Sequence, residues 1–256
     1  MTDYPSFVLG ASTTTRTEDQ LNNLKDFFQG TIEDFVVFDR ALYPVEVAKY
    51  EAGALPTVGS DEPLPDASEP AAPEVPVDLA VAEIPVAPGV DVPTATSFWT
   101  FDDGVEGVFG DAMGGPDLTA YRNEGGVAVL ANEAPTRPGP RGAGDQALEF
   151  NGDNSFAFIE HDQSYEMTQG TIALWVQPDD VSDDGMFLSK DQSGSGDGGH
   201  IRFGYEDGGH LFIRFANGDG SACSPTCRLR TRRCRSGLRR PLACHRCRAR
   251  LRRHRT

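Results

Sequence analysis

The feature that most limits how this 256-residue chain can fold is the stretch at residues 54–96, which is poor in residues that form regular structure. It contains nine prolines and eight acidic residues, and no lysine or arginine. Proline cannot donate to a backbone ladder and the acidic side chains repel one another, so we predict a disordered, extended linker. As a flexible coil the segment would span about 36 Å. Folded structure must therefore come from residues 1–53 and from residues 97 onward.

Charge is divided just as unevenly along the chain. Residues 1–222 carry all 39 acidic residues and 10 of the 23 lysines and arginines, a net charge of −29, whereas residues 223–256 carry +13 and all five cysteines. Such an acidic body repels phosphates, which excludes nucleic acid as its partner. No apolar run approaches the roughly 18 residues of a membrane-spanning helix. The first residues have no basic start followed by an apolar stretch, so we expect no signal peptide in this chain.

Residues 223–256 allow three interpretations. They could be a basic arm that binds nucleic acid by neutralising phosphates. They could hold zinc through Cys244 and Cys247, although the other cysteines lack the second paired spacing that a structural site usually shows. They could also be an out-of-frame translation, since arginine, cysteine, histidine, proline and alanine dominate when GC-rich DNA is read in the wrong frame. We favour the frameshift and predict a disordered tail.

The first 53 residues contain two apolar segments and one short amphipathic segment. Residues 6–10 form a short apolar run and residues 31–38 are rich in β-branched and aromatic residues, and both patterns favour strands. Pro44 suits the first turn of a helix because its missing N–H would have no partner there, and Gly53 suits the position after the last turn. We therefore predict two strands followed by one helix.

From residue 97 onward the pattern is one of short apolar segments separated by Gly- and Asp-rich turns. In residues 201–205 apolar residues alternate with Arg202 and Gly204, which is typical of half-buried antiparallel strands. Residues 151–154, Asn-Gly-Asp-Asn, are a strong hairpin signal. Many short strands with few helices predict an all-β antiparallel sandwich. The strand segments are 98–101, 147–150, 156–159, 171–176, 186–188, 201–205 and 211–215.

Several of these segments carry a family resemblance. The residues concerned are FWTFD at 98–102, ALEFNG at 147–152, GTIALWVQP at 170–178, FLSKD at 187–191, and FQGTIEDFVVFDRAL at 28–42 with Glu46-Val47 after it. Together they resemble the laminin-G-like, concanavalin A-like lectin/glucanase jelly-roll family, in the form found in bacterial multi-domain secreted proteins. The resemblance implies an antiparallel jelly-roll β-sandwich. It says little about function, because the fold carries lectins, adhesion modules and glycosidases alike.

The order of these motifs is unusual for that family. Residues 1–53 resemble the C-terminal part of one such domain, whereas residues 97–222 resemble the N-terminal two-thirds of a second one. We therefore expect the chain to be an internal fragment of a tandem protein, with an incomplete sandwich. The linker is long enough for the strand at 31–38 to pair with strands between 147 and 176 and so fill part of the gap.

The acidic turns are the candidate metal sites. Calcium takes carboxylate and carbonyl oxygens from flexible loops, and the resemblance places calcium-binding acids in the loop at 190–200. Asp197 and Asp191 are therefore the first candidates, with Asp153 and Asn154 in the other turn as weaker ones. The alternative is that Asp and Gly simply form turns on an acidic surface.

No catalytic constellation is apparent. Glycosidases use two carboxylates aimed into a groove, but Glu33 and Asp34 are adjacent and should point to opposite faces of a strand. We predict a non-catalytic module that binds a glycan or an extracellular protein, with Ca²⁺ as the cofactor to expect and no membrane partner. The parent protein would be extracellular or on the cell surface. The alternatives are an accessory domain of a polysaccharide-degrading enzyme and nucleic-acid binding through residues 223–256.

Overall fold

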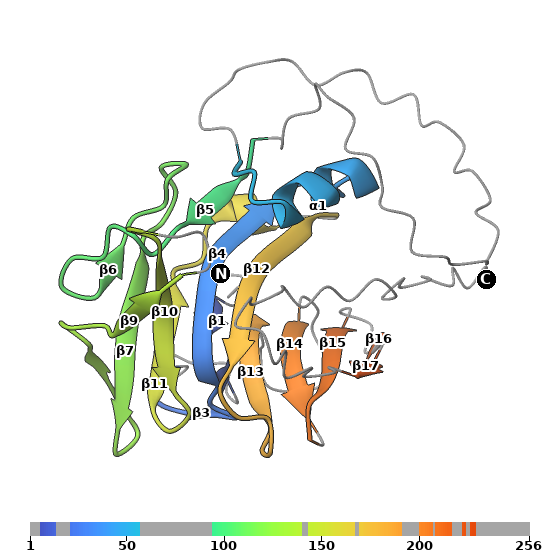
Figure 1. Ribbon diagram of the computed structural model, residues 1–256. Helices are drawn as coiled ribbons and strands as arrows, with labels where there is room; N and C mark the ends of the chain where they lie inside the picture. The colour runs from blue at the N-terminus through green and yellow to red at the C-terminus, as the bar shows by residue number, and fades with distance from the viewer. Residues whose placement is uncertain are drawn as a thin grey trace.

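Strand β4 (Gln29–Phe38) lies in the middle of the molecule and is buried along nearly its whole length. The structure is a computed structural model, and it describes residues 6–13, 21–56, 94–139, 143–166, 169–190, 200–206, 208–216, 222–223 and 226–228. Two antiparallel sheets face each other across an apolar core, with β4 inside the smaller one (Figure 1). The predicted all-β sandwich is confirmed.

The smaller sheet has the order β12-β4-β10-β9, and β5 pairs with the other end of β4. Its remaining strands are β5 (Ser97–Trp99), β9 (Thr136–Pro138), β10 (Gln146–Asn151) and β12 (Thr171–Pro178). The pairing of β4 places Leu148 beside Ile32 and Val176 on its other side. The predicted pairing of 31–38 with strands between 147 and 176 is therefore confirmed.

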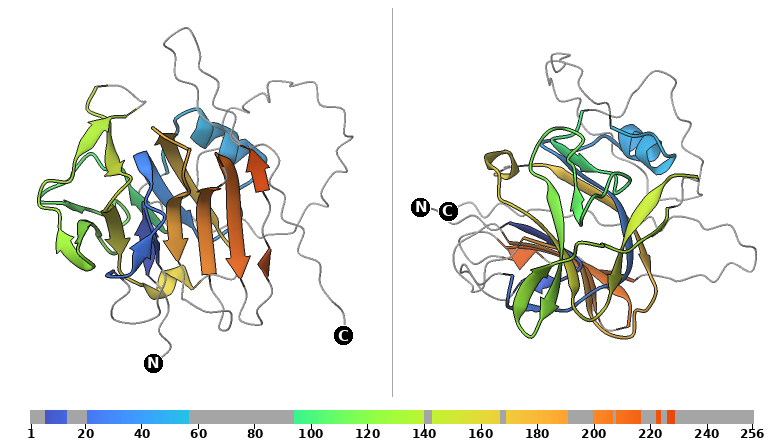
Figure 2. Two further views of the ribbon diagram at one scale, coloured as in Figure 1. Left: turned by 90° about the horizontal axis from the view of Figure 1, so that it is seen from below. Right: turned by 90° about the vertical axis from the view of Figure 1, so that its left-hand side faces the viewer.

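The larger sheet has the order β16-β15-β14-β13-β1-β11-β7-β6, with β8 paired to β7 and β17 to β15 (Figure 2). Its central strand β1 (Phe7–Leu9) also comes from the N-terminal segment and lies between β11 and β13. The other strands are β6 (Val108–Phe109), β7 (Leu118–Glu124), β8 (Val127–Leu130), β11 (Ser155–Ile159), β13 (Gly185–Lys190), β14 (His200–Glu206), β15 (His210–Ala216), β16 (Ala222–Cys223) and β17 (Thr226–Arg228). A small third sheet pairs β2 (Ser12–Thr13) with β3 (Leu24–Lys25).

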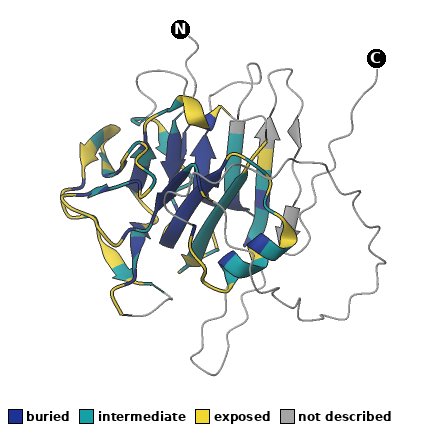
Figure 3. Ribbon diagram, turned by 90° about the horizontal axis from the view of Figure 1, so that it is seen from above, coloured by how far each residue is buried: buried dark blue, intermediate teal, exposed yellow. Residues whose placement is uncertain are grey.

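The core between the sheets is aromatic, and the N-terminal segment supplies much of it. Figure 3 shows that the buried residues lie mainly on strands in the middle of the molecule. Phe35 stacks on Trp99 with ring centroids 5.2 Å apart, and Phe28 meets Phe187 edge-to-face at 5.1 Å. Such pairs add about 0.5–1.5 kcal/mol to the free energy gained by burial. Residues 6–38 and residues 97–215 therefore share one core, although the linker separates them in the sequence.

Strand β4 contains a β-bulge at the position of its two acids, Glu33 and Asp34. Asp34 has a left-handed backbone (φ 51°), and the pairing with β12 shifts by one residue at this point. Ile32 and Phe35 consequently both contribute to the core. Strict alternation therefore fails between these two residues, so the prediction that Glu33 and Asp34 point to opposite faces stays a prediction.

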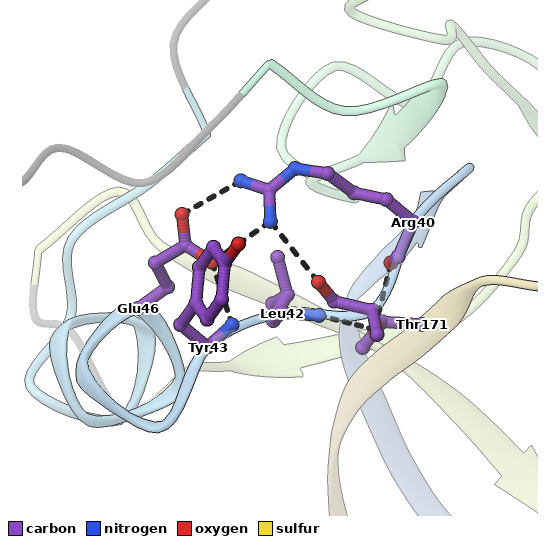
Figure 4. A network of polar contacts seen from close by, with 6 residues as sticks. Arg40, Leu42, Tyr43, Glu46 and Thr171 are labelled. Atoms are coloured by element: carbon purple, nitrogen blue, oxygen red, sulfur yellow. Dashed lines mark hydrogen bonds and ion pairs between the residues drawn. The ribbon is translucent and has the colours of Figure 1, made fainter. Parts of the chain in front are cut away.

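Helix α1 (Pro44–Glu51) forms where Pro44 and Gly53 predicted it. The Glu46 carboxylate accepts hydrogen bonds from both terminal nitrogens of Arg40, at 3.0 and 2.6 Å, and from the Tyr43 N–H at 2.7 Å (Figure 4). Burial opposes ionisation of Glu46, but these hydrogen bonds outweigh it and lower its pKa. The Thr171 hydroxyl donates to the Arg40 carbonyl and accepts from the Leu42 N–H, both at 3.0 Å, which joins the helix entry to β12.

Glu46→Gln is expected to lower the free energy of unfolding by about 1–2 kcal/mol, because charge-assisted hydrogen bonds to Arg40 and to the helix N-terminus are lost. Urea unfolding followed by circular dichroism measures this change. Glu51→Gln, the same substitution at the other end of α1, is the control and should be neutral or slightly stabilising, since a negative charge is unfavourable near a helix C-terminus. Equal losses in both variants would contradict a specific role for Glu46.

The linker and most of the tail lie outside the described residues. Residues 57–93 and 229–256 are not described, so the predicted linker and the predicted tail gain no structural account there. At the start of the tail, β16 and β17 pair with β15, a strand pairing that the sequence did not predict. In the part of the chain that the structure describes, no helix has the length and apolar character needed to cross a membrane.

Candidate functional site

A cavity of about 170 Å³ lies at one end of the sandwich, where the turn after β5 approaches the segment between β8 and β9. Its polar lining comes from three separate stretches of chain. These residues are Asp102, Glu106, Asn132, Glu133, Thr136 and Gln146. Phe101 and Phe109 lie beneath them, almost fully buried, in an edge-to-face pair with centroids 5.4 Å apart.

The backbone at the cavity is held in an uncommon conformation. Phe101 (φ 64°) and Glu106 (φ 51°) both adopt the left-handed region, which is rare for residues other than glycine. A side chain at Gly107 (φ 78°) would overlap the Ala131 carbonyl. Left-handed bulky residues cost free energy and persist where their surroundings enforce them, which is common at ligand sites.

Hydrogen bonds fix the cavity walls to each other. The Asp102 carboxylate accepts the Gln146 N–H at 2.7 Å, which ties the turn after β5 to the start of β10. The Thr136 hydroxyl donates to the Gln146 side-chain carbonyl at 3.0 Å. The carboxylates of Glu106 and Glu133 and the amide of Asn132 remain on exposed residues at the rim. The described lining residues include no lysine or arginine, so the cavity offers hydrogen-bond acceptors, amide donors and a net negative charge.

The predicted metal residues are not part of this cavity. Asp153 and Asn154 lie in the β10–β11 turn, where the Asn151 side-chain oxygen accepts both of their N–H groups at 3.0 Å. The Asn151 amide in turn donates to the Asn154 side-chain oxygen at 2.8 Å, so Asn154 and its neighbours serve the turn. Asp191 and Asp197 lie outside the described residues. Within the described ranges, no group of three or more His, Cys, Asp or Glu side chains is placed to hold a metal ion.

Two buried carboxylates converge at a second place, next to Gly139 just after β9. Glu33 and Asp145 are 2% and 8% exposed. A Cβ atom at Gly139 would overlap the Asp145 carboxylate and lie 3.0 Å from the Glu33 carboxyl carbon. Gly139 thus allows the backbone to pass directly over both acids, an arrangement that no pattern in the sequence indicates.

Lys190 is the most unusual cation among the described residues. It is 6% exposed, its ammonium donates to the Tyr165 carbonyl at 2.9 Å, and it lies 5.0 Å from the centre of the Phe7 ring. Burial lowers its pKa to about 8, and the charge of Glu166 offsets only part of that effect. Lys190 is the last residue of β13 and the first of the predicted calcium loop, but nothing in the sequence marked it as buried.

No family model matches this sequence, and neither a curated protein nor a solved structure matches it. The resemblance to laminin-G-like domains therefore stays a prediction from the motifs. Assignment of a function to the cavity depends on its own chemistry.

The cavity residues were missed at the sequence level for an identifiable reason. Asp102 belongs to one of the Gly- and Asp-rich turns, Asp102-Asp103-Gly104, and its sequence context predicts only a turn former. Asn132, Glu133 and Thr136 lie in a segment without apolar periodicity, so no pattern separated them from an ordinary polar loop. Only the pairing of β9 with β10 brings them beside Asp102.

Proposed function

We propose that this chain is a non-catalytic binding domain that takes a carbohydrate unit in the cavity lined by Asp102, Glu133 and Gln146. The observation that carries the proposal is the lining itself, which combines carboxylate, amide and hydroxyl groups over a rigid aromatic base. Sugar hydroxyls both donate and accept hydrogen bonds, so carboxylate acceptors and amide donors suit them. The cavity is smaller than the roughly 300–1,000 Å³ typical for drug-sized ligands, which favours one sugar unit or a chain end.

The exposed polar groups of the cavity and the fixed backbone that carries them support this proposal. Hydrogen bonds between Asp102 and Gln146 and between Thr136 and Gln146 set the cavity shape before a ligand arrives. Preorganisation lowers the entropic cost of binding. The same property would serve an accessory domain of a polysaccharide-degrading enzyme, whose catalytic part would then lie on another domain.

The test is a titration of the full chain with soluble cello-, xylo-, manno- and chito-oligosaccharides, followed by heteronuclear NMR. Binding is expected to shift the amides of Asn132, Glu133 and Gln146. Glu133→Gln should weaken the responding sugar about tenfold, or about 1.4 kcal/mol, because a charge-assisted acceptor is lost. Glu124→Gln, an exposed acid at the end of β7, is the matched control and should leave the affinity unchanged.

Two results would contradict a carbohydrate site here. One is the absence of amide shifts at millimolar concentrations of every oligosaccharide. The other is an equal loss of affinity in Glu133→Gln and Glu124→Gln, which would show that net charge, and not the cavity, controls binding. Repeating the titration with and without Ca²⁺ tests the predicted metal separately, with Asp197→Asn and Asp191→Asn as the variants expected to abolish any dependence.

A further inference from the structure

Strand β12 is the outermost strand of the smaller sheet and has an open edge. Among the described strands it pairs only with β4, so alternate N–H and C=O groups along its eight residues point away from the sheet. Its sequence, TIALWVQP, contains no charged residue, and proline occurs only at its last position. Long, uncharged edge strands readily accept a further strand, and proteins normally protect them with charges, proline or a covering segment.

Most of the other described edge strands are short or covered, which makes β12 different. On β8 the Ala128 N–H donates to the Asn22 side chain at 3.0 Å, so this edge is covered. Strand β9 has three residues and ends at Pro138, and β6 has two. Strands β16 and β17, which pair with β15 at the end of the larger sheet, have two and three residues. Among these edge strands, β12 is the long one, and it lacks charged residues and has proline only at its last position.

The sheet opposite β12 extends beyond it and leaves an apolar face without a covering layer in the described part of the chain. Figure 1 shows β14 and β15 continuing past β12, the last strand of the smaller sheet. Strand pairing puts Tyr205 opposite Leu211 and Phe203 opposite Ile213, so these side chains share one face. Tyr205 is part of the core, Phe203 and Leu211 are half-buried and pack against it, and Ile213 is half-buried. One open edge and one half-covered apolar face thus meet at the same place.

We propose that this place binds an extended segment of another polypeptide, which adds as a strand to β12 and covers Phe203, Leu211 and Ile213. Backbone hydrogen bonds to β12 would supply affinity, and the apolar face would select side chains at every second position. The occupant must be thin. Because β14 and β15 project beyond β12, a second whole sandwich joined edge-to-edge through β12 would meet them with its own projecting strands, whereas a single strand fits above them.

The negative charge of the molecule favours cationic side chains at the positions between the apolar residues of the partner. The full chain has a net charge of −16 even with its basic tail, and Asp179, Asp180, Asp183 and Asp184 follow β12 directly. Arg137 pairs with Asp179; Asp180 binds the Ser182 hydroxyl and retains its charge. A partner segment with lysine or arginine between its apolar positions would complement this surface. The proposed partner is thus an alternating apolar and cationic strand.

The experiment uses the full chain and a labelled ten-residue peptide with valine or isoleucine at every second position and lysine or threonine between them. Fluorescence anisotropy should give a Kd below about 100 µM, or −5.5 kcal/mol. Two further peptides carry N-methyl groups on either the odd or the even residues, which removes the N–H donors of one edge. We expect one of the two to lose at least tenfold in affinity and the other to bind like the parent. A peptide with glutamate in place of lysine should bind more weakly.

Substitutions in the chain test the apolar face. Ile213→Lys should weaken peptide binding at least tenfold, whereas Val129→Lys, the same kind of change on the exposed side of β8, should not. Thermal unfolding of both variants confirms that they fold. Equal binding of both N-methylated peptides, no binding of the parent peptide at 1 mM, or equal affinity in Ile213→Lys and the unsubstituted chain would overturn the proposal. So would a dimer that light scattering detects and that Ile213→Lys dissociates, since the occupant would then be a second copy. None of these results depends on the carbohydrate cavity.

Discussion

A chain cut once within residues 57–93 is expected to stay together as a complex of its two pieces. Strands β1 and β4, which come from the N-terminal piece, lie between strands of the C-terminal piece in both sheets. Phe7, Leu9, Ile32, Phe35 and Val37 are each 1% exposed or less. Burying one such side chain contributes about 1.5–3 kcal/mol, so we expect the pieces to bind with a Kd below about 1 µM.

The experiment replaces residues 66–73 with a protease recognition site, cleaves the folded protein and applies it to size-exclusion chromatography. The pieces should co-elute in buffer and separate in urea, and the unfolding midpoint of the cut protein should rise with protein concentration. Residues 94–256 alone should unfold without a cooperative transition, which addition of the N-terminal piece restores. The uncut variant is the control for the replaced residues.

Separation of the two pieces in buffer at micromolar concentration would contradict the single sandwich. It would favour the arrangement in which residues 1–53 and 97–222 belong to two different domain copies, as the order of the motifs suggests. Co-elution would show that the two segments complement each other within this chain.

The strands that the sequence predicted are those in which apolar side chains dominate. Residues 31–38 and 171–176 are rich in β-branched and aromatic residues, and both form strands of the smaller sheet. Strand β7, in contrast, reads LTAYRNE, with two buried positions at its start, two exposed ones toward its end and only two strongly apolar residues. It was missed because its stability comes from pairing with β8 and β11, and not from its own composition.

The irregular backbone within a predicted strand could not be predicted from the sequence. An aspartate in the middle of β4 is compatible with ordinary strand geometry as well as with a bulge, and only the packing of Ile32 and Phe35 into one core selects the bulge at Asp34. The helix was easier because Pro44 and Gly53 act through local sterics alone. The cavity was hardest, because its walls come from turns that are distant in sequence and meet only after β9 and β10 have paired.

The stability of the protein should depend on pH through Lys190, with a maximum near pH 10. The pKa of Lys190 is about 8 in the folded protein because the side chain is buried, and the ordinary value is 10.5. Between pH 8 and pH 10.5 the unfolded chain therefore holds a proton that the folded chain has lost, so the free energy of unfolding rises with pH. The difference in pKa corresponds to an increase of about 3 kcal/mol across this window.

Two buried tyrosines reverse the trend at higher pH. Burial raises the pKa of Tyr165 and of Tyr205 to about 12 from the ordinary value of 10.0. Above pH 10 the unfolded chain loses phenolic protons that the folded chain retains, so the free energy of unfolding falls again. The free energy of unfolding should thus rise from pH 8. It should reach its maximum near pH 10, where the gain from Lys190 is balanced by the loss from the two tyrosines, and decline toward pH 12.

Lys190→Met isolates the contribution of the lysine. The variant loses the hydrogen bond to the Tyr165 carbonyl, worth about 1 kcal/mol, but no longer buries an ammonium group. It should therefore be more stable than the unsubstituted chain by about 2 kcal/mol at pH 7, and its stability should not rise between pH 8 and pH 10. Urea titrations at intervals of one pH unit measure both effects. Lys25→Met removes an exposed lysine, 56% accessible along its side chain, and should keep the rise. A rise of equal size in Lys190→Met would assign the pH dependence to other groups, because a buried methionine has no proton to release.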